Sequence, residues 1–117
     1  MAMYRDLIAW QRAMALVVAV YRATDSFPPR EHFGLTAQVR RAAVSVPSNI
    51  AEGHGRQSRK EFGHHLDIAA GSLREVETQL LIAQQLDYLV EPTSGQLLSL
   101  SSEANRLITG LFNSLDR

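Results

Sequence analysis

The sequence of 117 residues contains no cysteine. Disulfide frameworks, thiol catalysis and zinc sites built from thiolates are therefore excluded, and the composition fits a reducing compartment such as the cytoplasm. Long apolar runs are lacking too, because the longest uncharged one, Ala13–Tyr21, has about half of the roughly 20 residues that a membrane-spanning helix needs. Arg5, Asp6 and Arg12 argue against a secretory signal. We expect a cytoplasmic protein with no membrane contact.

A net charge is lacking as well, since twelve basic and twelve acidic residues cancel. No global field then draws the chain onto nucleic acid or anionic lipid. The charges are nevertheless uneven: residues 38–60 hold five bases and one acid, whereas residues 61–103 hold seven acids and one base. The five bases are Arg40, Arg41, Arg56, Arg59 and Lys60. This pattern fits both a phosphate-binding surface and an ordinary surface of mixed charge.

Apolar residues recur at steps of three and four in four segments, which predicts four amphipathic helices. The apolar stripes run over Leu7–Tyr21, Leu35–Ile50, Phe62–Ala83 and Leu97–Leu111. No segment alternates convincingly with the period of two that is typical of strands. Four such helices joined by short loops most economically form an all-α, antiparallel up-down four-helix bundle, which we expect as a single domain over residues 1–117.

Local signals mark the ends of these helices. The first helix is expected over residues 5–24, with its stripe at Leu7, Trp10, Met14, Val17 and Tyr21. Asp25–Pro29 ends this helix. Ser58–Glu61 forms a capping box before the third helix, and Thr93–Gln96 can cap the fourth.

The second helix carries a proline and a long stretch without charge. Pro47 removes an amide donor and predicts a kinked helix, while a separate helix starting near Asn49 is the alternative. No residue of Ala42–Ala51 is charged, so the outer face is also suited to be covered, which predicts a partner subunit. The expected interface residues are Ala43, Val44, Pro47, Ser48 and Ala51. The small residues Ala69–Ser72 fit either such an interface or packing within the chain.

Basic residues also lie at the predicted start of the third helix, where positive charge is unfavourable. Arg59 and Lys60 occupy the first turn of the third helix, and Arg56 lies just upstream, although the macrodipole favours acids there. One interpretation is an anion site, in which free amides and three cations bind a phosphate while Gly53 and Gly55 let the backbone approach. The other is chance, because the cost at an exposed site is only about a few tenths of a kcal/mol. The P-loop pattern is missing, so nucleotide hydrolysis is not expected.

Combinations of catalytic or metal-binding residues are scarce. Glu61 and His65 could share a helix face as metal ligands, but no second histidine follows at the required spacing. Glu75 and Glu77 point to different faces of a helix, which is wrong for a carboxylate pair that shares one substrate. We therefore expect no enzymatic activity, no cofactor and no metal ion.

The longest distinctive segment is Phe33–Gly53, followed by Gly55–Ser58 and Glu61–Phe62. Together these segments resemble the four-helix-bundle family of 23S rRNA intervening-sequence proteins. Shorter segments agree with this resemblance, namely Ala9–Gln11, Phe27–Pro28, Ile68–Leu73 and Glu77–Leu80. The chain departs from the family pattern at Asp87, where glycine is expected before the tyrosine, and at His64–His65, where apolar or aromatic residues are more usual.

The resemblance implies binding partners and a number of subunits. Relatives are encoded within intervening sequences of bacterial 23S rRNA genes or elsewhere in the chromosome, and a similar bundle is the accessory protein of diversity-generating retroelements. Those accessory proteins form five-membered rings that bind a reverse transcriptase and nucleic acid, so the resemblance implies a homopentamer. Two functions remain open: a non-catalytic module in which the five bases bind RNA or DNA phosphates, and a scaffold that holds a protein partner such as a reverse transcriptase.

Overall fold

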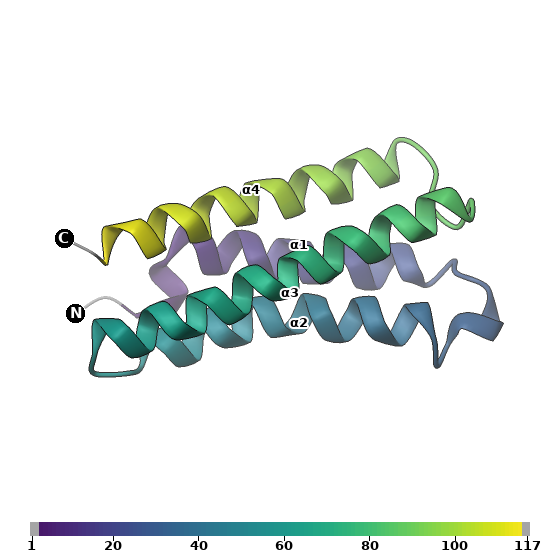
Figure 1. Cartoon of the computed structure of the whole chain (residues 1–117). Coiled ribbons are helices and arrows are strands. Elements are labelled where there is room, and N and C mark those ends of the chain that lie inside the picture. Colours follow the sequence, from purple (N-terminus) through teal and green to yellow (C-terminus); the bar gives the residue numbers. More distant parts are fainter. Residues whose placement is uncertain (1–2, 116–117) are drawn as a thin grey trace.

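In the computed structural model, which describes residues 3–115, four long helices pack side by side (Figure 1). They are α1 (Ile8–Thr24), α2 (Leu35–His54), α3 (Arg59–Gln85) and α4 (Thr93–Ser114). Two short 3-10 turns, η1 (Tyr4–Asp6) and η2 (Pro29–Glu31), precede α1 and α2, and residues 3–115 contain no strand. Successive helices run back and forth, so the first and last described residues lie at the same end (Figure 1). The all-α four-helix fold expected from the sequence is confirmed.

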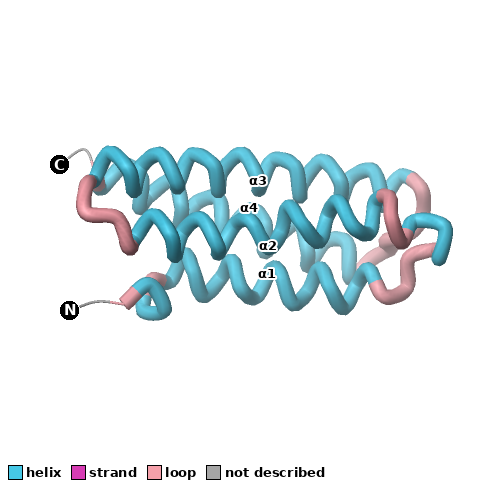
Figure 2. The backbone as a smooth tube through the Cα atoms, turned by 90° about the horizontal axis from the view of Figure 1, so that it is seen from below, coloured by secondary structure: helices cyan, strands magenta, loops and turns pink. Residues whose placement is uncertain are grey.

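Each helix packs against two neighbours. α2 contacts α1 and α3, and α4 contacts α3 and α1, so that the four helices of the chain surround a common core. Figure 2 shows their side-by-side arrangement from below. The predicted stripes of α2 and α3 supply much of the core, because the side chains from Val39 to Ile50 and from Leu66 to Ala83 that carry these stripes are buried. Within residues 3–115, none of the helices combines the length and the apolar character that a membrane span requires.

The core stripe of α1 differs from the prediction. Its buried residues are Ala9, Ala13, Leu16, Val20 and Thr24. The bulkier stripe that we expected to be buried lies on the flank of the helix, where Met14 is 37% exposed and Tyr21 is 41% exposed. Small alanines at the buried positions are suited to helix packing, and the larger apolar side chains beside them lie partly at the surface.

α1 also begins later than predicted, at Ile8 rather than near residue 5. Residues 4–6 form the turn η1 instead, in which the Met3 amide donates to Asp6 Oδ2 at 3.0 Å. This side-chain hydrogen bond gives the backbone an alternative to the first helical turn.

α2 and α3 form the most extensive contact in the bundle, through small and polar residues. The hydroxyls of Ser45 and Ser72 lie 2.8 Å apart, and Asn49 Oδ1 lies 3.1 Å from His65 Nδ1. Gly53 approaches α3 so closely that a Cβ atom there would lie 2.7 Å from His65 Cβ. Ser72 is 6% exposed, so at this point the predicted small-residue segment serves packing within the chain.

α2 runs without interruption through Pro47 to His54. The alternative of a separate helix starting near Asn49 is therefore wrong. Pro47 itself is buried, and its ring lies on the side of the helix that the bundle covers. The kink that the sequence predicts at this residue stays a prediction.

The ends of α3 follow local hydrogen bonds. Ser58 Oγ accepts the amide of Glu61 at 3.0 Å, as the predicted capping box requires. At the other end, the Tyr88 amide donates to the Ala83 carbonyl at 2.9 Å in a Schellman arrangement. Asp87 takes the left-handed conformation there, with a φ of 62°. This conformation explains why a glycine is expected at this position.

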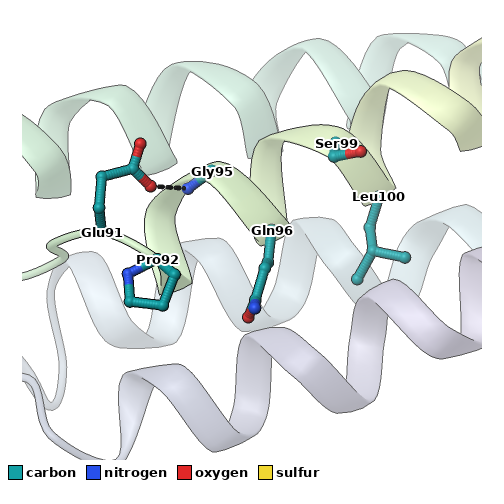
Figure 3. A pocket seen from close by; sticks show the side chains of 6 residues that line it. All are labelled: Glu91, Pro92, Gly95, Gln96, Ser99 and Leu100. Carbon is teal, nitrogen blue, oxygen red and sulfur yellow. Dashed lines mark hydrogen bonds between the residues drawn. The ribbon is translucent and has the colours of Figure 1, made fainter.

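The start of α4 is capped differently from the prediction. Thr93 is the first helical residue, and Glu91 Oε1 accepts the Gly95 amide at 2.7 Å (Figure 3). The same oxygen also accepts the Ser94 hydroxyl at 3.0 Å. A carboxylate at this position satisfies free amides and lies favourably in the field of the macrodipole. Glu91 therefore does the capping that the sequence assigned to Thr93–Gln96.

Glu31 joins the two loops at the end of the bundle where α2 and α4 begin. Its Oε1 atom accepts the Leu35 amide at 3.0 Å, and its Oε2 atom accepts the Tyr88 hydroxyl at 2.9 Å. These two hydrogen bonds, with a smaller contribution from Arg30, hold the pKa of the Glu31 carboxyl below its ordinary value. The ionised carboxylate thus both caps α2 and fastens the α3–α4 loop.

Candidate nucleic-acid interface

The five predicted phosphate-binding residues do not form one cluster. Arg40 and Arg41 lie in the first half of α2, whereas Arg56 lies in the loop after it and Arg59 and Lys60 in the first turn of α3. A helix rises 1.5 Å per residue, so α2 alone separates the two groups by about 20 Å. The single basic cluster inferred from the sequence is therefore wrong for one copy of the chain, because the length of α2 separates residues that are near in sequence.

Arg40 has a structural role. Its Nε atom donates to Thr24 Oγ1 at 2.7 Å, and its Nη2 atom donates to the Tyr21 carbonyl at 3.2 Å and to Asp25 Oδ1 at 3.1 Å. Its guanidinium also lies 4.6 Å from the centre of the Tyr21 ring. These contacts fasten α2 to the end of α1, so Arg40 is engaged within the chain. Its neighbour Arg41 is exposed but lies far from the other three bases, and its assignment to phosphate binding stays a prediction.

The remaining three bases, Arg56, Arg59 and Lys60, lie together between α2 and α3, and we call them the loop-end cations. All three are exposed. Arg56 Nη2 donates to Glu52 Oε1 at 2.8 Å, and both side chains of this ion pair are about half exposed to solvent. Exposed pairs of this kind contribute little to stability, so the Arg56 guanidinium can exchange Glu52 for another anion at small cost.

A hollow of about 410 Å³ adjoins the loop-end cations, between the start of α3 and the end of α4. Arg59 and Lys60 lie at its edge together with Asp67, and its lining includes Gly63 and the half-buried ring of Phe112. We call it the α3–α4 hollow. Sequence reasoning missed it, although an isolated glycine inside a strongly periodic helix was a usable signal.

The predicted interface residues fall into two groups. Val44 and Ser48 are exposed and Ala51 is half-buried, so these three can meet another subunit. Ala43 is 0% exposed and Pro47 is buried, because both face the neighbouring helices of the same chain. Their assignment to an intermolecular interface is corrected, whereas the assignment of the other three stays a prediction.

An exposed apolar surface continues from Val44 onto α1. Met14, Val18 and Tyr21 share one stripe of that helix and are 37%, 43% and 41% exposed. The stacking of Arg40 on Tyr21 places this stripe beside α2, where Val44 follows Arg40 by one helical turn. We call these four apolar residues the α1–α2 apolar strip, which the sequence had assigned in part to the core.

Several other polar side chains of residues 3–115 bond to one another between α2 and α3. Asn49 donates to Ser45 and contacts His65, so no histidine reaches a serine hydroxyl in this chain of hydrogen bonds. Within residues 3–115, no three histidine or carboxylate side chains are placed to hold a metal ion. A shallow groove along the first turns of α4 contains the carboxylate of Glu91, which is engaged in capping (Figure 3).

Comparisons with known proteins agree with this fold. The family model of the 23S rRNA-intervening sequence protein matches residues 5–110. A crystal structure from Bacteroides thetaiotaomicron VPI-5482, described as a protein with unknown function from the S23 ribosomal protein family, is 22% identical. It superposes with a TM-score of 0.81, over 90% of this chain and 98% of the other. No curated protein matches the chain. Because the family model covers most of the sequence, the chain belongs to the 23S rRNA-intervening sequence protein family.

Proposed function

We propose that the chain is a non-catalytic cytoplasmic module that self-associates and binds the phosphates of RNA or DNA through the loop-end cations. The observation that carries this proposal is the position of Arg59 and Lys60 beside the first amides of α3, with Arg56 in the adjoining loop. Cations beside the start of a helix, where the macrodipole also favours negative charge, suit a phosphate oxygen. Such contacts position a nucleic acid without reading its sequence.

Self-association would make this small charge effective. One copy offers only three loop-end cations, and the chain has no net charge. Several copies in one assembly bind a phosphate chain with an effective concentration that one copy lacks. The α1–α2 apolar strip supports association, because its four partly exposed apolar side chains would be shielded from water in an interface between copies. Five copies is the number that the family resemblance implies.

Sedimentation at fixed concentrations tests the assembly. Val44→Glu places a charge in the α1–α2 apolar strip and is expected to yield a smaller species than the wild-type protein. The control is Thr109→Glu, which adds the same charge at an exposed position of α4. A wild-type protein that sediments as a monomer would contradict the proposal.

Titration into labelled structured RNA at several salt concentrations tests phosphate binding. Replacing all three loop-end cations by Gln is expected to weaken binding and to flatten the plot of log K against log salt by up to about three units per copy. The control carries the same loss of charge at the exposed residues Arg22, Arg74 and Arg106. Equal slopes in the two variants would refute the assignment of phosphate binding to the loop end.

A second function, a scaffold for a protein partner such as a reverse transcriptase, is favoured by a different observation. Phe33 is 91% exposed and Val90 is 64% exposed, both in loops at the end opposite the loop-end cations. A ring so exposed contributes little to the fold and is suited to a hot spot of binding. Failure of the wild-type protein to bind RNA at low salt would favour this function, and Phe33→Ser would then abolish partner binding without lowering the unfolding midpoint.

A further inference from the structure

The α3–α4 hollow combines charged and aromatic groups in a fixed order. Lys60, Gly63 and Asp67 lie on one stripe of α3, at steps of three and four residues, and Phe112 reaches the same hollow from α4. Lys60 and Asp67 are exposed, and they stand about 10 Å apart along the helix by its rise of 1.5 Å per residue. A cation therefore lies at one end of this α3 stripe and a carboxylate at the other, and His64 and Phe112 line the same hollow.

Gly63 keeps the ring of Phe112 accessible. A Cβ atom at this position would lie 3.5 Å from Phe112 Cε2 and 3.9 Å from Leu115 Cδ1, which are ordinary contact distances. An alanine would therefore fit without moving its neighbours, and it would favour the helix more than glycine does. Close packing does not require the glycine, and its missing Cβ leaves space beside one edge of the half-buried Phe112 ring.

We propose that the α3–α4 hollow binds one unpaired nucleotide of a single-stranded RNA or DNA. The base stacks on Phe112 above Gly63, its phosphate lies toward Lys60, and the Asp67 carboxylate accepts a hydrogen bond from an N–H group of the base. Every base offers a flat π-face, and stacking on an aromatic side chain combined with a cationic path for the backbone is the usual chemistry of single-strand binding. A base inside a duplex has no free face, so a paired strand cannot enter the hollow in this way.

This inference rests on the proposed function, because Lys60 belongs both to the loop-end cations and to the edge of the hollow. The nucleotide site adds a preference for single strands over duplexes, which phosphate binding alone does not produce. Phosphate contacts by themselves favour duplexes at least as strongly as single strands, since a duplex carries the higher charge density. Discrimination in favour of an unpaired strand therefore reports on the hollow.

The test measures fluorescence anisotropy with a labelled RNA strand of roughly twelve nucleotides, which is long enough for a typical single-strand site. The same strand annealed to its complement is the paired probe, and a DNA strand of the same sequence shows whether ribose is needed. Gly63→Ala adds a methyl group beside the Phe112 ring, where it would obstruct a stacked base, and Phe112→Leu removes the ring but keeps an apolar side chain. The control is Gly110→Ala, an identical change on α4 where a Cβ atom would meet no other atom within 4 Å.

We expect the wild-type protein to bind the unpaired strand more tightly than the duplex. Gly63→Ala and Phe112→Leu should each weaken single-strand binding by about fivefold or more, the loss expected for one base–aromatic stack. Duplex binding should stay unchanged in both variants, and Gly110→Ala should behave as wild type with every probe. Binding of either the RNA or the DNA strand with this pattern supports the inference and shows which of them supplies the nucleotide.

Two negative results are distinguishable. Equal affinity for paired and unpaired probes, with Gly63→Ala indistinguishable from Gly110→Ala, would overturn the nucleotide site. If Lys60→Gln nevertheless weakened binding to these probes, the proposed phosphate binding would still hold. Absence of binding to every probe at low salt would overturn both the nucleotide site and the proposed function.

Discussion

The close contact between α2 and α3 at Gly53 allows a quantitative test of the packing. In Gly53→Ala the new Cβ atom would lie 2.7 Å from His65 Cβ, 2.9 Å from Phe62 Cδ1 and 3.3 Å from the Phe62 carbonyl oxygen. The Phe62 ring can rotate away, but a Cβ atom and a backbone oxygen move only with the helix. The two helices must therefore separate, which also stretches the 3.1 Å contact between Asn49 and His65.

The expected cost follows from two opposing effects. Overpacking of this kind typically costs about 1–3 kcal/mol. The better helix propensity of alanine offsets roughly 0.5–1 kcal/mol of that cost. We therefore expect Gly53→Ala to lower the free energy of unfolding by up to about 2.5 kcal/mol, measured by urea denaturation with circular dichroism at one fixed protein concentration.

Gly71→Ala is the matched control for this measurement. Its Cβ atom would meet only the flexible end of Arg74, at 3.8 Å, so the propensity effect acts alone. We expect this variant to be more stable than wild type by about 0.5–1 kcal/mol. A Gly53→Ala protein as stable as Gly71→Ala would refute the close approach of α2 and α3.

Three further substitutions test contacts described above. Arg40→Met keeps an apolar stem but loses the hydrogen bonds to Thr24 and Asp25, and we expect unfolding measurements to show a loss of about 1–3 kcal/mol without any change in the salt slope of RNA binding. Asp87→Gly is expected to raise the free energy of unfolding by about 0.5–1 kcal/mol, because glycine adopts a φ of 62° without strain. Since the pKa of Glu31 is lowered in the folded state, the unfolded chain binds its proton more readily and the ionised carboxylate stabilises the fold above the ordinary value of 4.5. The stability difference between wild type and Glu31→Gln, followed by denaturation at several pH values, is therefore expected to shrink as the pH falls below 4.5.

Each of these three expectations has a clear contrary result. A flattened salt slope in Arg40→Met would show that this residue binds phosphate. A loss of stability in Asp87→Gly would contradict the left-handed conformation at the end of α3. A difference between wild type and Glu31→Gln that stays constant from neutral to acid pH would show that the Glu31 carboxylate does not stabilise the fold.

Sequence periodicity predicted α3 well because this helix carries one unambiguous apolar stripe and a strong start signal. Ser58 supplies the cap, and the stripe from Leu66 to Ala83 is buried in the structure as expected. α1 was harder, since it carries two apolar stripes about a quarter turn apart. From side-chain size alone, the stripe with Trp10 and Tyr21 is expected to be the buried one. Which stripe faces the core depends instead on how the other helices pack around α1, and this is a property of the whole bundle.

The candidate site was predicted only in part. Periodicity located Arg59 and Lys60 at a helix start, which needs local information alone. The role of Arg40 depends on Thr24 and Asp25, which lie beyond a turn and an intervening loop, so no local pattern reveals it. The contribution of Phe112 to the α3–α4 hollow likewise depends on how the end of α4 meets the start of α3.

The extensive contact between α2 and α3 also bears on how the bundle folds and opens. These two helices are consecutive in the chain and joined by a short loop, so closing them costs little conformational entropy. We expect the α2–α3 hairpin to form early and to be the last part to exchange its amide hydrogens with solvent, which native-state hydrogen exchange would measure. α1 and α4, which carry most of the α1–α2 apolar strip and the Phe112 side of the α3–α4 hollow, would then be the parts that open most readily, whereas the loop-end cations and the α3 side of the hollow lie on the more stable half of the molecule.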